Sequence, residues 1–143
     1  MRLVLDTNVL VAATRSDQGA SRRLMVAVLG GQCRLLVSAS LLIEYEAVLK
    51  RDEHRAQSGA SIEDVDGLLD ALAQLAEPVE ISYLWRPHLA DPGDELVLET
   101  AVNGGADMIA TFDLRHLAAA AASFGIAVAR PGTIVRRLQE QRS

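Results

Sequence analysis

The stretch that decides the fold is LVLDTN at residues 3–8. Its first three residues are aliphatic, and a short run of this kind is typical of a strand buried on both faces. The run stops at Asp6, and residues 6–8 are of the types that form turns and cap helices. The stretch therefore predicts a buried strand with a carboxylate at its carboxyl end.

Similar apolar runs alternate with helical patterns along the rest of the chain. Strands are expected at residues 3–5, 34–37, 79–81, 108–110 and 126–129. Helices are expected at 19–29, 41–50, 61–75, 94–103, 114–122 and from 131 onward. Residues 6–8, 52–60 and 87–92 are expected to be turns or exposed connections. Strands that alternate with helices predict an α/β domain, doubly wound, with a central and mostly parallel sheet flanked by helices.

Length and composition suit one such domain over residues 1–143. Half of the residues are hydrophobic but only 3% are aromatic, so the core is expected to be aliphatic. Cys33 is the one cysteine and cannot form an internal disulfide, which favours a reducing, cytoplasmic location. The apolar start is broken at Asp6 and no run of 18 apolar residues follows, so neither a signal peptide nor a membrane span is expected.

The net charge counts against a nucleic-acid-binding protein when it is taken alone. There are 14 Lys and Arg residues against 19 Asp and Glu, for a formal charge of −5, whereas phosphate binding normally needs a basic face. A cluster of carboxylates that binds cations would also make a chain acidic, and the bound cations would reverse the field locally. The charge therefore leaves a metal-dependent nuclease open.

Four acidic residues stand at related positions in the predicted elements. Asp6 and Asp113 each follow a strand, Asp94 opens a helix, and Glu44 lies near the start of another helix. Because ligands of open parallel sheets bind beyond the carboxyl ends of the strands, these side chains are expected to converge there. Each acid alone also suits a helix cap or a solvated surface position. The joint pattern is what indicates a site.

Converging carboxylates raise each other's pKa, so they need a positive charge between them. Mg²⁺ and Mn²⁺ are hard cations that take oxygen ligands. An acidic centre of this composition is what a phosphodiesterase with one or two metal ions requires. The residues themselves therefore predict metal-dependent hydrolysis of a phosphodiester.

The same residues resemble the motifs of a known family. LVLDTNVL at residues 3–10 resembles the opening of the PIN domain, and SASLLIEYEAVLKR at 38–51 resembles its second acidic motif. DPGD at 91–94, GAD at 105–107 and TFD at 111–113 resemble its closing half. The resemblance covers essentially the whole chain in order. More narrowly, the chain resembles the VapC-related toxin components of bacterial toxin–antitoxin pairs.

This resemblance implies a single-domain Rossmann-like fold, a three-layer sandwich, and endoribonuclease activity on single-stranded RNA with one or two Mg²⁺ or Mn²⁺ ions. It also implies a homodimer and a small antitoxin protein as partners. The catalytic, metal-binding acids of the family fall on Asp6, Glu44, Asp94 and Asp113. Residues that would support these ligands are Thr7, Asn8, Thr111 and Asp91.

Two features depart from the family pattern. Asp91 and Glu95 flank Asp94, and Glu99 lies one turn beyond Glu95, so the third ligand could be shared or shifted. Phe112 stands where small or polar residues are common and is expected to narrow access beside Asp113.

Cationic RNA contacts are expected around the acidic centre. The candidates follow the first and the last acidic motif and are Arg15, Arg22, Arg23 and Arg115. The mechanism does not require the three histidines, and His116 is assigned a surface or packing role.

Three other functions fit the sequence less well. A haloacid-dehalogenase-type phosphatase needs a second Asp where Asn8 stands, and a downstream lysine, whereas Lys50 is the one lysine and lies in a predicted helix. A dinucleotide-binding protein needs Gly-x-Gly-x-x-Gly after the first strand, which is missing here. A non-catalytic PIN-fold module that binds RNA or protein has no reason to retain all four acids.

Overall fold

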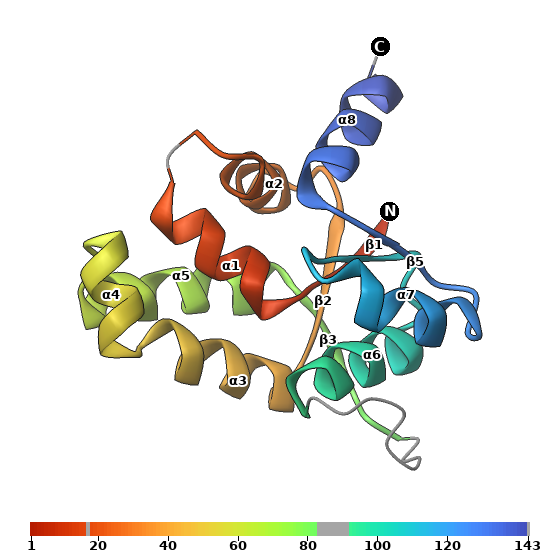
Figure 1. Ribbon diagram of the computed structural model, residues 1–143, viewed down its shortest axis with the longest axis horizontal. Helices are drawn as coiled ribbons and strands as arrows, with labels where there is room; N and C mark the ends of the chain where they lie inside the picture. Colours follow the sequence, from red (N-terminus) through yellow and green to blue (C-terminus); the bar gives the residue numbers. More distant parts are fainter. Residues whose placement is uncertain (17, 83–91, 143) are drawn as a thin grey trace.

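The computed structural model describes residues 1–16, 18–82 and 92–142. Its five strands form one parallel sheet in the order β3-β2-β1-β4-β5 (Figure 1). The strands are β1 (Arg2–Leu5), β2 (Arg34–Ser38), β3 (Glu77–Val79), β4 (Met108–Ala110) and β5 (Ala127–Ala129). The predicted fold class, an α/β domain with a central parallel sheet, is confirmed. The expected loop at 87–92 lies outside the described residues except for Pro92.

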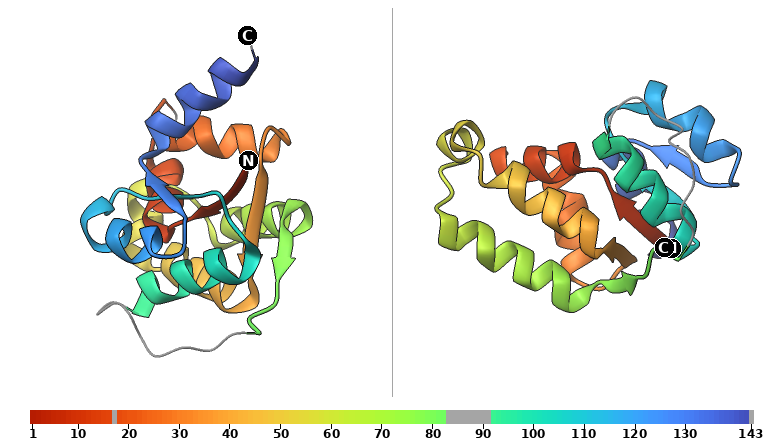
Figure 2. Two further views of the ribbon diagram at one scale, coloured as in Figure 1. Left: turned by 90° about the vertical axis from the view of Figure 1, so that its right-hand side faces the viewer. Right: turned by 90° about the horizontal axis from the view of Figure 1, so that it is seen from below.

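Helices lie on both sides of the central strand. They are α1 (Thr7–Arg15), α2 (Ala20–Leu29), α3 (Ala39–Leu49), α4 (Asp52–Ser58), α5 (Ile62–Leu75), α6 (Pro92–Gly104), α7 (Leu114–Ala122) and α8 (Pro131–Arg142). Seen from below, α1, α3 and α5 gather on one side of β1, and α6 and α7 on the other (right-hand view of Figure 2). In the described part of the chain, no helix is both long and apolar enough to cross a membrane.

Two helices correct the expectations from the sequence. Residues 7–15, expected to begin as a turn, form α1, which Asp6 precedes in an extended conformation and which buries Val9, Leu10 and Ala13. Residues 52–58, expected to be an exposed connection, form α4, which has no buried residue. Hydrophobic periodicity cannot reveal a helix without a buried face, which is why α4 was not predicted. Helix α1 begins with two polar residues, Thr7 and Asn8, which are also typical of a turn.

Side chains cap the first turns of two of these helices. The Ser38 hydroxyl accepts a hydrogen bond from the Leu41 amide at the start of α3. Ser61 and Asp64 form a capping box at the start of α5. The third strand lies two residues earlier than expected, because Glu77–Val79 pair with the last three residues of β2.

The strand order creates a switch point at β1. The chain goes from β1 to β2 and β3 on one side, and α6 then carries it across to β4 and β5 on the other. In open α/β sheets, the crevice outside the strand ends at such a reversal is where ligands bind. Leu5 pairs with Ala110, and the Asp6 amide donates to the Ala110 carbonyl at 2.9 Å. The segments that follow β1 and β4 therefore begin side by side.

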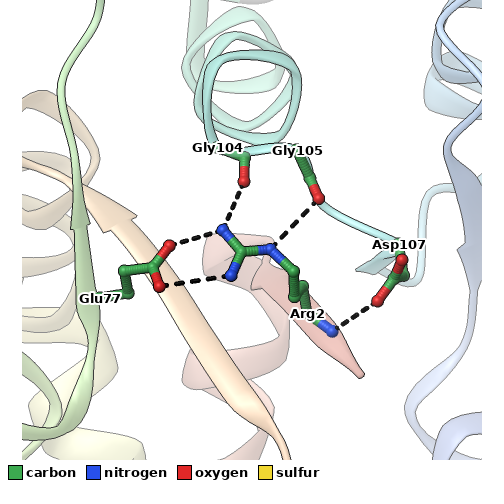
Figure 3. Close-up of polar contacts among 5 residues, drawn as sticks. All are labelled: Arg2, Glu77, Gly104, Gly105 and Asp107. Atoms are coloured by element: carbon green, nitrogen blue, oxygen red, sulfur yellow. Dashed lines mark hydrogen bonds and ion pairs between the residues drawn. The ribbon is translucent and has the colours of Figure 1, made fainter.

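The opposite edge of the sheet is fastened by Arg2 (Figure 3). Its guanidinium binds both carboxylate oxygens of Glu77 and donates to the carbonyls of Gly104, at 2.7 Å, and Gly105, at 3.3 Å. Its backbone amide donates to Asp107 at 2.8 Å. These contacts join the starts of β1 and β3 to the end of α6, at the edge away from the predicted site.

Close packing between the end of α6 and β3 explains why position 104 is a glycine. A Cβ at Gly104 would lie 2.8 Å from a methyl carbon of Val79, so α6 can approach β3 this closely only without a side chain at that position.

Candidate metal centre

Asp6 lies at the carboxyl end of β1, where only 7% of it is exposed. It is the residue before α1, and its carboxylate accepts a hydrogen bond from the Thr111 hydroxyl at 2.6 Å. Thr111 follows β4 and is fully buried. The two segments that meet at the switch point are therefore joined by one short bond to a carboxylate.

The same hydroxyl also holds the segment that carries the next acid. Thr111 Oγ1 accepts a hydrogen bond from the Asp113 amide at 2.9 Å. The Asn8 side-chain oxygen accepts a weaker bond from the Phe112 amide at 3.4 Å. Residues 6–8 and 111–113 thus form one network in which Thr111 orients Asp6 and fixes the backbone at Asp113.

Asp94, Asp113 and His116 come close enough together to share a cation. One ligand atom of each lies within 4.8 Å of the others, and this is the one such group of three found in residues 1–16, 18–82 and 92–142. Asp94 belongs to the first turn of α6, Asp113 precedes α7, and His116 is in the first turn of α7. His116 Nδ1 lies 2.7 Å from the nearer Asp113 oxygen.

The sequence alone predicts a surface or packing role for His116. Its side chain is 70% exposed, in agreement with a surface position, and it also lies against Asp113, which was not predicted. The signal available in the sequence was its spacing of three residues from Asp113 at the start of a predicted helix, which brings the two side chains to one face.

Glu44 is placed by the packing of its helix. It is half-buried on α3, which contacts both α1 and α6. A buried hydrogen bond of 2.7 Å between the hydroxyls of Ser38 and Thr100 fixes the start of α3 against α6. Glu44 therefore lies on a helix that packs against both α1, which follows Asp6, and α6, which carries Asp94. Glu44 is not a member of the three-residue group.

Burial dominates the electrostatics of Asp6. Burial raises the pKa of Asp6, and the charge of Asp113 adds to that rise, while the hydrogen bonds from Thr111 and from the amides of Thr7 and Asn8 oppose it. The hydrogen bond to Asp113 raises the pKa of His116. A cation bound here would favour the ionised form of Asp6.

Similar electrostatics extend along α6. Burial raises the pKa of Glu99, and the charge of Glu95, one turn earlier, adds to the rise. Both residues are half-buried, but neither belongs to the three-residue group. Asp91 lies outside the described residues.

The donor set fits a divalent cation. Two carboxylates and an imidazole offer hard oxygen ligands and one nitrogen, and atoms within 4.8 Å of one another can reach a common ion with small side-chain movements. For an ion with ligands at about 2.1 Å, opposite ligand atoms are about 4.2 Å apart. Carboxylate oxygens suit Mg²⁺ and Mn²⁺, and an imidazole favours a transition metal.

The arginines predicted to contact RNA lie on three helices, one of them in α7 beside this centre and the others in α1 and α2. Arg115 is exposed next to His116. Arg15 ends α1, nine residues or about 13 Å along the helix from Asp6. On α2, Arg22 donates to the Ala13 carbonyl at 2.6 Å, and Arg23 donates to the Gln18 carbonyl at 3.1 Å. Their contacts with RNA stay predictions.

Comparison with known proteins agrees with this geometry. The family model described as PIN domain matches residues 2–115 of this chain. None of the curated proteins matches it. The matched region includes β1 to β4, both helices that carry Asp94 and Glu44, and the network from Asp6 to Asp113. Because the match covers well over half of the chain, this protein belongs to the PIN-domain family, whose members are generally metal-dependent nucleases.

Proposed function

We propose that this protein is an endoribonuclease that uses Mg²⁺ or Mn²⁺ to hydrolyse phosphodiester bonds of single-stranded RNA. The observation that carries the proposal is the network at the switch point, in which Thr111 joins Asp6 to the segment of Asp113, with Asp94 beside it. Carboxylates gathered at this edge of a parallel sheet suit a bound cation and a phosphate ligand.

The acids that would hold one or two ions are Asp6, Glu44, Asp94 and Asp113. A bound cation supplies an activated water molecule and stabilises charge on the leaving oxygen. Thr111 keeps the Asp6 carboxylate in one orientation. His116 restrains Asp113 on the exposed side, where it is also close enough to act as a ligand itself. The burial of Asp6 excludes water from one side of the centre.

The first test is cleavage of single-stranded RNA by wild-type and Asp6→Asn protein, purified in parallel with Mn²⁺ present. We expect wild-type protein to cut and Asp6→Asn to lose cleavage while keeping its fold, because asparagine retains the shape but not the charge. The mutant is also the control for a contaminating nuclease. Equal cleavage by both proteins would place the catalytic centre elsewhere.

The second test separates a nuclease from a non-catalytic PIN-fold module. Calorimetric titration with Mn²⁺ and Mg²⁺ should show binding to the wild-type protein. His116→Ala should weaken Mn²⁺ binding more than Mg²⁺ binding, because an imidazole nitrogen binds the transition metal Mn²⁺ better than it binds Mg²⁺. Absence of binding by either ion would favour the scaffold function.

We extend the proposal to a role as the toxin of a toxin–antitoxin pair, which the resemblance of the four acidic motifs supports. A small antitoxin protein and a second copy of this chain are the partners that this role implies. Induced expression of the wild-type chain should arrest bacterial growth, and Asp6→Asn should not. Measurement of the molar mass in solution tests the dimer.

A further inference from the structure

A hollow of about 560 Å³ lies between α1, α3 and α4, outside the three-residue metal group. The residues on which the argument rests are Asn8, Val11, Ala12 and Arg15 of α1, Val48 of α3 and His54 of α4. On α1, Asn8 and Ala12, like Val11 and Arg15, are four residues apart, so the four side chains form one strip of the helix. The hollow therefore follows α1 for most of its length.

One end of the hollow adjoins the candidate metal centre. Asn8 stands two residues after Asp6, and its side-chain oxygen accepts the Phe112 amide of the segment that carries Asp113. On the facing helix, Glu44 precedes Val48 by one turn and so lies on the same side of α3. The hollow therefore ends beside the segments that carry Asp6 and Asp113.

The other end of the hollow is basic. Arg15 donates from Nη2 to Nδ1 of His54, so the imidazole keeps its second nitrogen for another partner. In the described ranges of the chain, no carboxylate lies within ion-pair distance of Arg15. This is a positive group at the end of a groove in a chain whose net charge is −5.

Between the two ends the surface is apolar, with Val11, Ala12 and Val48 contributing it. A nucleotide base is a flat, mostly apolar ring, and in an RNA strand a phosphate lies on each side of its nucleotide. Such a nucleotide is complementary to an apolar surface that has a metal centre at one end and an arginine at the other. The volume of the hollow also lies within the range of about 300–1,000 Å³ that is usual for small-molecule sites.

We propose that this hollow is a nucleotide subsite of the nuclease, an inference that rests on the proposed function. It binds the base of a nucleotide next to the scissile phosphate on Val11, Ala12 and Val48, and Arg15 binds a phosphate further along the strand. A base can enter only when it is unpaired, so the subsite selects single-stranded over double-stranded RNA. The scissile phosphate then lies at the acidic end.

Two substitutions test the two halves of the subsite separately. Arg15→Gln removes the charge at nearly the same length, and Ala12→Leu fills the apolar part with a good helix former. Arg137→Gln on α8 and Ala73→Leu on α5 are matched controls, because both positions are exposed and lie outside the hollow. Each change is made in active protein and also in the Asp6→Asn background, where binding can be measured without cleavage.

Binding of a fluorescent single-stranded RNA oligonucleotide is followed by anisotropy at several salt concentrations. Arg15→Gln should weaken binding and reduce the slope of log K against log salt by about 0.7, the value for one phosphate contact on a single strand. Ala12→Leu should weaken binding about tenfold with the slope unchanged, because it removes a stacking surface and no charge. In active protein, both changes should raise KM and leave kcat within a few fold.

An RNA with one base removed identifies the nucleotide that occupies the hollow. At one position near the cleavage site, removal of the base should weaken RNA binding by the control variants. The same removal should not change RNA binding by Ala12→Leu, because leucine already fills the place of that base. If Asp6-dependent cleavage is present but the hollow variants bind and cut like their controls, the subsite is wrong, and a protein partner becomes the better occupant. If no variant shows Asp6-dependent cleavage, the proposed function fails and the subsite fails with it.

Discussion

Replacing Thr111 with valine isolates the bond on which the metal centre depends. Valine has nearly the same shape, and position 111 is fully buried, so the core should stay filled. What disappears is the donor to the Asp6 carboxylate at 2.6 Å and the acceptor for the Asp113 amide at 2.9 Å. The change therefore tests orientation of the ligands rather than packing.

The size of the effect follows from the kind of bond. A hydrogen bond to a charged group contributes about 1.5–3 kcal/mol. Loss of a group that orients a metal ligand typically lowers metal affinity about 10- to 100-fold, which is about 1.4–2.8 kcal/mol. The two ranges agree, so we expect Thr111→Val to weaken Mn²⁺ binding by that factor. Since the Thr111 hydrogen bond lowers the pKa of Asp6, its removal should also move Mn²⁺ binding to higher pH.

The assay is calorimetric titration with Mn²⁺ at several pH values, with the thermal unfolding of each variant measured in parallel. Thr111→Ser is the matched control, because it keeps the hydroxyl and loses only a methyl group. We expect Thr111→Ser to bind Mn²⁺ much as the wild type does. If Thr111→Val also bound it with unchanged affinity and pH dependence, the hydroxyl would not orient a metal ligand, and Asp6 would lose its assigned role.

Three further changes test stability at defined points. Without metal, Asp6→Asn should raise the unfolding temperature at neutral pH, because folding raises the pKa of Asp6 and ionised Asp6 therefore destabilises the folded state. The difference in unfolding temperature between the mutant and the wild type should vanish as the pH falls toward 3.8, where Asp6 is protonated in the folded protein. Arg2→Lys should lower the unfolding temperature but leave kcat unchanged, because lysine cannot bind a carboxylate and two carbonyls in the same geometry, and the contacts lie at the far edge of the sheet. Tyr45→Phe should lower the free energy of unfolding by about 1 kcal/mol in urea titration, since the buried hydroxyl donates to the Leu5 carbonyl.

The parts of the fold that the sequence predicted are those with a clear apolar pattern. The strand at residues 3–5 is recognisable as a short continuous apolar run, and the helix at 61–75 because its buried residues follow the helical period. Helix α4 has no buried residue, and its local signals are acidic residues in the first turn, Arg55 near the end and Gly59 as the left-handed cap after it. Such signals are too common in exposed segments to identify a helix.

The candidate site divides in the same way. Asp6 and Asp113 were placed correctly relative to the sheet, because position after a parallel strand determines the edge on which a side chain lies. The double role of the Thr111 hydroxyl depends on the β1–β4 pairing, which brings together residues 105 positions apart. Likewise, the hollow beside α1 could not be predicted while residues 7–15 were not recognised as a helix.

The two edges of the sheet differ in what they contribute. At the amino edge, Arg2 binds a carboxylate and two carbonyls, so opposite charges are paired there. At the carboxyl edge, Asp6 is buried with a raised pKa and lies near a second carboxylate, which makes the folded chain less stable than an uncharged residue would. A cation that binds only the folded state reverses this cost, because its binding free energy adds to the stability of the fold. The unfolding temperature should therefore rise more with Mn²⁺ in the wild type than in Asp6→Asn, which links the electrostatics of the fold directly to the proposed catalytic centre.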